Sequence, residues 1–152
     1  QINILNKFIS FLAGYQKLVV VGIGCTMVTP FLGVALVADL RLASPRAVFS
    51  MAHRKYGLHP SGAIPFFLTH YLGHSKAMEI QLSDRLLSDE AFRLGLVSQI
   101  LPTDRFEENC IRYVQQYLEN YRSTLRLTKR LNNFKHRWLE EYLEHESSLI
   151  NL

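Results

Sequence analysis

LVVVGIGCTMVTPFLGVALVADLRLAS, residues 18–44, is the most informative part of the sequence. It begins with β-branched residues typical of a buried strand, passes through Gly24 and Pro30, and continues with helix-compatible residues to Ala38. Proline suits the first turn of a helix, because its missing N–H has no partner there. The pattern predicts a strand, a turn that offers backbone N–H groups at a helix start, and a helix. A second turn, Gly57–Gly62, is expected to face the first.

The uncharged run Leu18–Ala38 could also be considered as a membrane span, because its 21 residues are long enough to cross a bilayer. Glycines, threonines and Pro30 interrupt it, however, and the mean hydropathy of the chain is only +0.03. Residues 1–11 lack the basic region and cleavage site of a signal peptide. Cys25 and Cys110 show no disulfide or metal-type spacing. We therefore expect reduced thiols, no membrane segment and a cytoplasmic location.

Length and composition indicate one ordinary globular unit, with 152 residues, 48% of them hydrophobic and 20% charged. The remaining pattern alternates short strands and helices. Helices are expected at 2–12, at 64–82 with a break at Gly73, and from Ser88; strands are expected at 40–43, 47–49 and 97–101. Long amphipathic helices follow at 106–118 and 123–149. We predict a core over residues 1–101 and a helical region for oligomerisation over residues 102–152.

Several short motifs occur in one fixed order along the chain. They are Lys17, Val19–Val21 and Gly24; Ala35, Leu36, Ala38, Asp39, Arg41, Ala43 and Ser44; Ala47 and Phe49; Gly57, Leu58 and Pro60; Leu72, Gly73, Lys76 and Ala77; and Ser88, Glu90, Ala91 and Leu94–Val97. Together they resemble the signature of the enoyl-CoA hydratase/isomerase (crotonase) family. The resemblance implies an α/β fold, the second half of a crotonase-like (ClpP/crotonase) ββα spiral with a helical C-terminal region. It also implies an acyl-CoA or acyl thioester ligand, no cofactor beyond the coenzyme A of the substrate, and a homotrimer or hexamer.

The family stabilises a thioester enolate with two backbone N–H groups that form an oxyanion hole. One of them normally lies in a glycine loop, which here reads Met27-Val28-Thr29-Pro30-Phe31. Counting from Gly24 assigns the donor to Thr29, whereas counting back from Asp39 assigns it to Pro30, which has no N–H. We predict Thr29 as the donor, with Gly24, Met27 and Val28 beside the substrate. The resemblance assigns the second donor to the family's first half, which this sequence does not contain.

Hydratases of the family activate water with two glutamates. The first position falls on Leu32 or Gly33 and the second on His53, so ordinary hydration is not expected. An isomerase, a decarboxylase or an atypical hydratase fits better, with His53 as the proton donor to the enolate. His53 can instead simply fill the vacated position, and the alternative function is an inactive binding or scaffold subunit. Tyr56, Gly57 and Pro60 are expected to contact the acyl group, although Tyr56 can also only support the turn.

Positive charge is concentrated near the C-terminus. Six Lys or Arg residues and no acid lie between Arg122 and Arg137. Arg126 and Lys129 are predicted to contact the phosphates of coenzyme A, the alternative being a solvated helix face. No motif for nucleic-acid recognition accompanies these charges, so nucleic acid is not an expected partner. His70 and His74 have a metal-type spacing but no third ligand, so no metal site is predicted.

Overall fold

The computed structural model describes residues 2–150, except for the side chains of residues 2, 3, 119–123, 135 and 150. Its elements in chain order are α1 (Ile2–Gly14), β1 (Val20–Ile23), β2 (Thr26–Val28), α2 (Phe31–Val37), β3 (Leu40–Ala43), β4 (Val48–Ser50), the 3₁₀ helix η1 (Ala52–Tyr56), α3 (Ile64–Leu72), α4 (His74–Leu82), β5 (Arg85–Leu87), α5 (Ser88–Arg93), β6 (Gln99–Ile100), α6 (Phe106–Asn132), the 3₁₀ helix η2 (Asn133–Trp138) and α7 (Leu139–Ile150).

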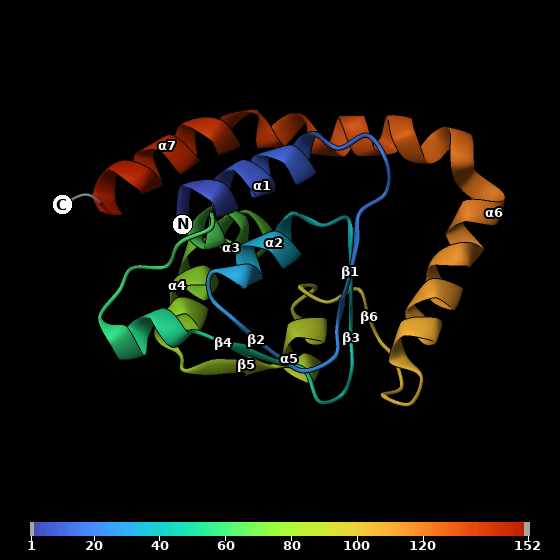
Figure 1. The fold of residues 1–152 in the computed structure, drawn as a ribbon, viewed down its shortest axis with the longest axis horizontal. Helices are drawn as coiled ribbons and strands as arrows, with labels where there is room; N and C mark the ends of the chain where they lie inside the picture. Colours follow the sequence, from blue (N-terminus) through green and yellow to red (C-terminus); the bar gives the residue numbers. More distant parts are fainter. Residues whose placement is uncertain (1, 151–152) are drawn as a thin grey trace.

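The strands form two small sheets of three strands each. One has the order β1-β3-β6 with all strands parallel, and the other has β2 parallel to β4 and β4 antiparallel to β5. Twice the chain contributes a strand to the first sheet, a strand to the second, and then helix; β5 of the second sheet, α5 and β6 of the first sheet follow. Figure 1 shows the two sheets at a steep angle to each other, with α2, α3 and α4 beside the second sheet. This repeated strand–strand–helix path is the predicted spiral.

The core lies between the sheets and the helices. Its fully buried side chains include Leu36, Leu42, Met51 and Phe67. Arg41 is also buried, and its guanidinium donates to the carbonyls of three residues, Leu36, Ala38 and Leu96. A buried cation is tolerated here because its N–H groups are satisfied by carbonyl oxygens.

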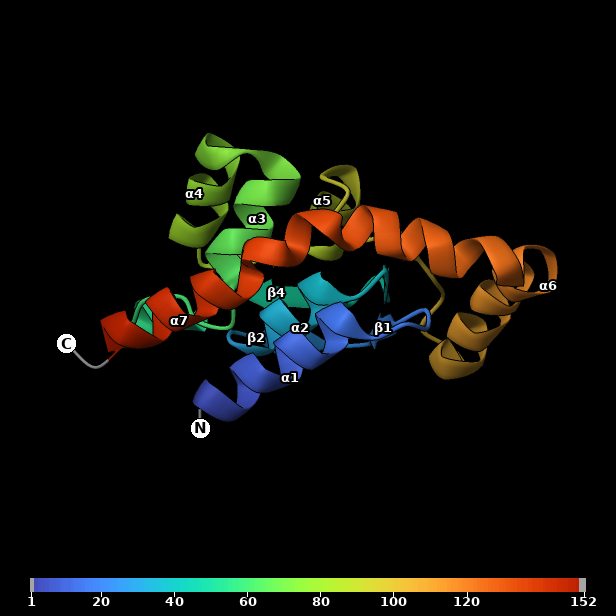
Figure 2. The ribbon, with the colours of Figure 1, turned by 90° about the horizontal axis from the view of Figure 1, so that it is seen from above.

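The C-terminal helices wrap around this core. In Figure 1, α6 rises beside the sheet β1-β3-β6 and then crosses above it to η2 and α7. Seen from above in Figure 2, α7 continues past α1, and α1 lies beside α2. Contact between α1 and α7 therefore joins the two ends of the described chain. The predicted boundary at residue 101 stays a prediction.

The local patterns predicted most elements, with some differences. Gly73 separates α3 from α4 as expected, and its φ of 76° suits glycine. The run 18–38 is divided among β1, β2 and α2, and β2 was not expected. Strand β5 was also missed, and its residues lie between two helices that were predicted. Within the described residues, no helix combines the length and apolar character needed to span a membrane.

Candidate functional site

The predicted catalytic residues Thr29 and His53 lie together. Thr29 follows β2 and His53 lies in η1 just after β4, and the parallel pairing of these strands brings their carboxyl ends side by side. The backbone N–H of His53 donates to Thr29 Oγ1 over 3.3 Å, and His53 Nδ1 lies 3.4 Å from the same oxygen. His53 is only 8% exposed. The imidazole is therefore held in a defined position beside the loop that starts α2.

The pKa of His53 is lowered from its ordinary value, mainly because burial disfavours the charged imidazolium. The positive charge of Arg54 and the neighbouring His59 lower it further, while a hydrogen bond to the backbone carbonyl of Gln81 opposes the decrease. His53 is consequently neutral at pH 7. In that state His53 is suited to accept a proton first and return it later, whereas it was predicted only as a proton donor.

The Thr29 backbone N–H, predicted as the oxyanion donor, is already used. It donates to the carbonyl of Ser50 over 3.3 Å, as the last bond between the β2 and β4 segments. Because one N–H satisfies one strong acceptor, this bond competes with the predicted role of the Thr29 N–H as a donor to substrate, and that role stays a prediction. Thr29 also contributes its hydroxyl to the site. Phe31 and Leu32 follow in the first turn of α2, where backbone N–H groups have no carbonyl acceptor within the helix.

Gly33, one of the two positions assigned to the first family glutamate, has no room for a side chain. A Cβ built on Gly33 would lie 1.8 Å from the backbone oxygen of Gly62. The turn at residues 57–62 therefore packs directly against the start of α2, as the sequence predicted. A carboxylate at position 33 is excluded by this contact, and His53 occupies the second position.

The other residues predicted to contact the substrate differ in their location and in their exposure to solvent. Gly24 lies between β1 and β2, and its carbonyl accepts the hydroxyl of Ser44 over 2.8 Å. Met27 is half-buried against the core, whereas the next residue in β2, Val28, is 40% exposed. Tyr56 is 75% exposed at the end of η1, so in this structure it lines no closed pocket.

The turn after η1 is formed by residues that tolerate unusual backbone angles. Gly57 has a φ of 63° and caps η1 with its N–H, which donates to the carbonyl of Arg54. Pro60 is half-buried in the same turn. The roles of Tyr56, Gly57 and Pro60 in binding an acyl group stay predictions.

Lys129, predicted with Arg126 to contact the phosphates of coenzyme A, has partners within the chain, and the phosphate contact itself stays a prediction. Lys129 is 9% exposed, and its Nζ donates to Asp39 Oδ2 and to the carbonyl of Lys17, both over 2.7 Å. Its charge is thus committed to a buried ion pair that ties α6 to the start of β1 and β3. Arg126 lies on the exposed side of the same helix. Arg122, where the basic run begins, lies outside the described side chains.

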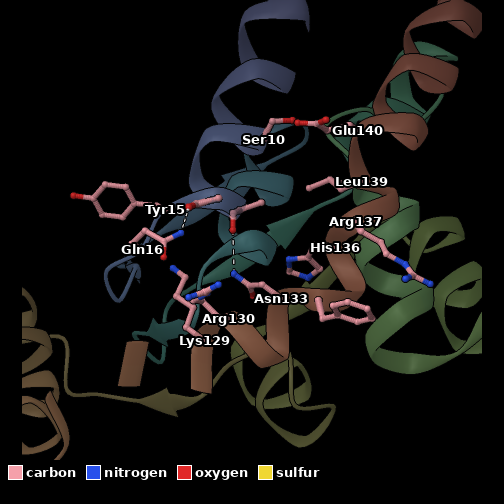
Figure 3. Close-up of a pocket in the computed structure, with 13 residues that line it drawn as sticks. Ser10, Tyr15, Gln16, Lys129, Arg130, Asn133, His136, Arg137, Leu139 and Glu140 are labelled. Atoms are coloured by element: carbon pink, nitrogen blue, oxygen red, sulfur yellow. Dashed lines mark hydrogen bonds between the residues drawn. The ribbon is translucent and has the colours of Figure 1, made fainter. Parts of the chain in front are cut away.

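A cleft of about 410 Å³ opens beside this ion pair, between the end of α1 and the α6–η2–α7 segment. Figure 3 shows Lys129 and Arg130 directed toward Gln16, with Asn133 bonded to the carbonyl of Ala13 and Gln16 to that of Gly14. None of the residues that line the cleft belongs to the Thr29 and His53 site. Among the described residues, no group of three or more potential ligands could hold a metal.

Sequence reasoning missed the buried carboxylate of Glu146. It is 3% exposed and accepts the backbone N–H groups of Gly62 and Ala63, each over 2.9 Å. One sequence signal could have revealed it. Leu139, Leu143 and Glu146 follow one another at the spacing of one helical face, so the acid stands where the period expects an apolar residue.

Comparison with known proteins agrees with this architecture. The sequence model of the family described as "Enoyl-CoA hydratase/isomerase" matches residues 14–151. A probable enoyl-CoA hydratase of Mycobacterium leprae is 34% identical over 130 residues, which make up 84% of this chain and 44% of that protein. The chain thus spans about half the length of the curated relatives it matches.

Solved structures give the same result. An enoyl-CoA hydratase from Mycobacterium avium subsp. paratuberculosis superposes with a TM-score of 0.86 at 26% identity, covering 99% of this chain and 65% of that one. A monofunctional enoyl-CoA isomerase from M. smegmatis gives a TM-score of 0.73 at 31% identity, covering 84% and 60%. The predicted crotonase-like α/β fold is confirmed. The chain belongs to the enoyl-CoA hydratase/isomerase family.

Proposed function

We propose that this chain contributes to an acyl-CoA site and moves a double bond rather than adding water. One observation carries the proposal: neither position where the family's hydratases have glutamates holds a carboxylate. The first falls on Leu32, which is an apolar residue, or on Gly33, whose side-chain space is filled by the Gly62 carbonyl oxygen, and the second is His53, a buried imidazole. Activation of water by a pair of carboxylates is therefore impossible at these positions. Isomerisation needs only one group that removes and returns a proton, and neutral His53 suits that task.

In this reaction His53 takes the proton from C2 of a 3-enoyl thioester. The electron pair passes to the thioester oxygen and forms a dienolate, and the imidazolium then returns the proton to C4, giving the 2-enoyl thioester. Atoms and charges balance without an oxidant or a second acid. The amides of Phe31 and Leu32 at the start of α2 are suited to stabilise the oxygen, since developing negative charge is favoured by backbone N–H donors. The likeness to a monofunctional enoyl-CoA isomerase supports this choice.

Calorimetry and a rate measurement test the proposal. Acetoacetyl-CoA and free coenzyme A should each bind with saturable heat, and 3-hexenoyl-CoA should be converted to the conjugated 2-enoyl form. Crotonyl-CoA hydration should be negligible. Absence of heat with both thioester and free coenzyme A contradicts the acyl-CoA proposal, and hydration at ordinary enzymatic rates contradicts the isomerase proposal.

The second candidate is a binding or scaffold subunit without turnover. It is favoured by the bond between the Thr29 N–H and Ser50, and by the two groups that hold the His53 ring, Thr29 Oγ1 and the Gln81 carbonyl. Saturable heat with no conversion of any enoyl-CoA supports this candidate over the enzyme. The absence of a further cofactor and the cytoplasmic location stay predictions.

We also propose a homo-oligomer, a trimer or a hexamer. Two exposed apolar stripes support it, and both have the 4-3-4 spacing of helix–helix contacts. The α1 stripe consists of Ile4, Phe8, Phe11 and Tyr15, which are 73%, 47%, 60% and 39% exposed; the α6–η2 stripe consists of Leu127, Leu131, Phe134 and Trp138, which are 60%, 77%, 67% and 54% exposed. Stripes of this kind on two different helices permit a ring in which one copy's α1 stripe meets the next copy's α6–η2 stripe.

Sedimentation measures this assembly. The wild-type protein should sediment as an oligomer at micromolar concentration, and Phe11→Lys or Leu131→Lys should shift it to the monomer because each introduces a charge into an apolar contact. Met78→Lys is the matched control, since Met78 is also exposed but lies on α4, away from both stripes. A monomeric wild type contradicts the proposal.

A further inference from the structure

Glu146 connects the C-terminal helix with two other parts of the molecule. Its Oε1 and Oε2 accept the backbone N–H groups of Gly62 and Ala63, and Oε1 also lies 3.4 Å from the donating Nδ2 of Asn6. Neither carboxylate oxygen faces solvent, because the residue is 3% exposed. A buried carboxylate is costly unless it is hydrogen-bonded, and here three donors from α1 and the turn before α3 satisfy it.

The turn that Glu146 holds has an unusual backbone. Gly62 and Ala63 have φ values of 75° and 56°, and the left-handed region is unfavourable for alanine. With both residues in this conformation, two successive N–H groups point at one carboxylate. Helix α3 starts at the next residue, so its positive end also favours the anion. The carboxylate therefore selects a turn conformation that Ala63 does not favour by itself.

The same turn packs against the start of α2. The Gly62 oxygen contacts Gly33, and a Cβ on Gly62 would lie 2.9 Å from the oxygen of Pro30. Pro30 directly follows Thr29, and the Thr29 hydroxyl holds both the backbone and the ring of His53. A continuous series of close contacts thus runs from Glu146 through Gly62 and Pro30 to Thr29 and His53.

We propose that Glu146 is a positioning residue for the acyl thioester site, which fixes the Gly62–Ala63 turn against α2 and thereby sets the place of Thr29 and His53. This inference rests on the proposed function for its effect on turnover. Its effect on the turn and on the His53 ring can be measured without any substrate. The C-terminal helix α7 then serves the chemistry of the site as well as the assembly of the fold.

The experiment compares Glu146→Gln with Glu144→Gln. Glutamine keeps the size of the side chain but loses one of the two acceptors, whereas Glu144 lies exposed on the same helix. In Glu146→Gln, amide hydrogen exchange at Gly62 and Ala63 should be at least tenfold faster than in wild type, and the NMR titration of the His53 ring should shift toward that of a free histidine. Turnover of 3-hexenoyl-CoA should fall at least tenfold with KM changed less than twofold. Glu144→Gln should match wild type in each measurement.

Three outcomes overturn parts of this scheme separately. Unchanged hydrogen exchange at Gly62 and Ala63 overturns the proposal that Glu146 fixes this turn. Faster exchange with an unchanged His53 titration and turnover leaves Glu146 a structural residue only and overturns the positioning role. If wild type binds no acyl-CoA, the proposed function fails, while exchange and titration still test the link from Glu146 to His53. Should Glu146→Gln not fold, Asn6→Ala, which removes the third donor to Glu146 together with the bond to Ser147, should produce the same changes on a smaller scale.

Discussion

Replacement of His53 by alanine is expected to lower the turnover of an enoyl thioester by about 10²–10⁴-fold, the usual contribution of general acid–base catalysis. His53 is the titratable group that the structure places in contact with Thr29, at the start of α2. Its removal takes away proton transfer but no phosphate contact. The affinity for free coenzyme A should therefore change less than twofold, as measured by calorimetry beside the isomerisation rate.

The matched control is His59→Ala, which removes an exposed imidazole from the turn that follows η1. It should leave the turnover within about twofold of wild type. Full activity in His53→Ala contradicts the assignment, and the proton-transfer group must then come from another part of the complete site.

The lowered pKa of His53 adds a pH signature to this prediction. As pH falls, kcat/KM of the wild type should decline only below 6.5, because the buried imidazole resists protonation and remains a base at lower pH than a free histidine. The contribution of His53 to the free energy of unfolding changes with pH in the same direction as kcat/KM. The unfolded chain binds the proton at a higher pH than the folded one, so the contribution of His53 to stability is complete above 6.5 and is lost as pH falls through the folded pKa. Urea unfolding of wild type and His53→Ala at several pH values separates this contribution.

Local sequence patterns predicted the parts of the fold that depend on neighbouring residues. The strand before Gly24, the helix after Pro30 and the break at Gly73 follow from residue type and period alone. His53 and Thr29 were assigned to one site only through the resemblance to a family, because 24 residues separate them, and their direct contact was not predicted. Strands β2 and β5 were missed, since residues 26–28 were assigned to the turn after Gly24 and residues 85–87 lie between two predicted helices.

The site residues whose surroundings were not predicted all have partners that are distant in the sequence. Lys129 and Arg126 were assigned to one face by helical spacing, but Asp39, 90 residues from Lys129, withdraws only Lys129 from the surface. Glu146 and Gly62 are 84 residues apart. The Thr29 N–H was predicted from loop length, whereas the pairing of β2 with β4 determines which amide remains unbonded. In each case the tertiary partner, rather than the residue type, decides the role.

A glutamate introduced at position 33, one of the two positions assigned to the first carboxylate of the family's hydratases, should damage the protein instead of creating a hydratase. Even Gly33→Ala should lower the free energy of unfolding by about 3 kcal/mol, the upper part of the range typical of overpacking. The reason is that its Cβ meets the Gly62 oxygen at 1.8 Å, and a backbone atom cannot rotate away as a side chain can. Urea unfolding monitored by circular dichroism measures the change.

Gly14→Ala is the matched control, because a Cβ at Gly14 meets no atom within 4 Å. It should leave stability within about 0.5 kcal/mol of wild type, as is usual for an open surface position. The N–H groups of Gly62 and Ala63 are hydrogen-bonded to the Glu146 carboxylate. These bonds oppose a movement of the Gly62 oxygen away from Gly33, which would be needed to accommodate a larger side chain at position 33. Gly33→Glu should then unfold at lower urea than Gly33→Ala and show no crotonyl-CoA hydration. A stable Gly33→Glu protein that hydrates crotonyl-CoA would mean that the turn is free to move, and both the steric exclusion of hydration and the rigidity assigned to Glu146 would be wrong.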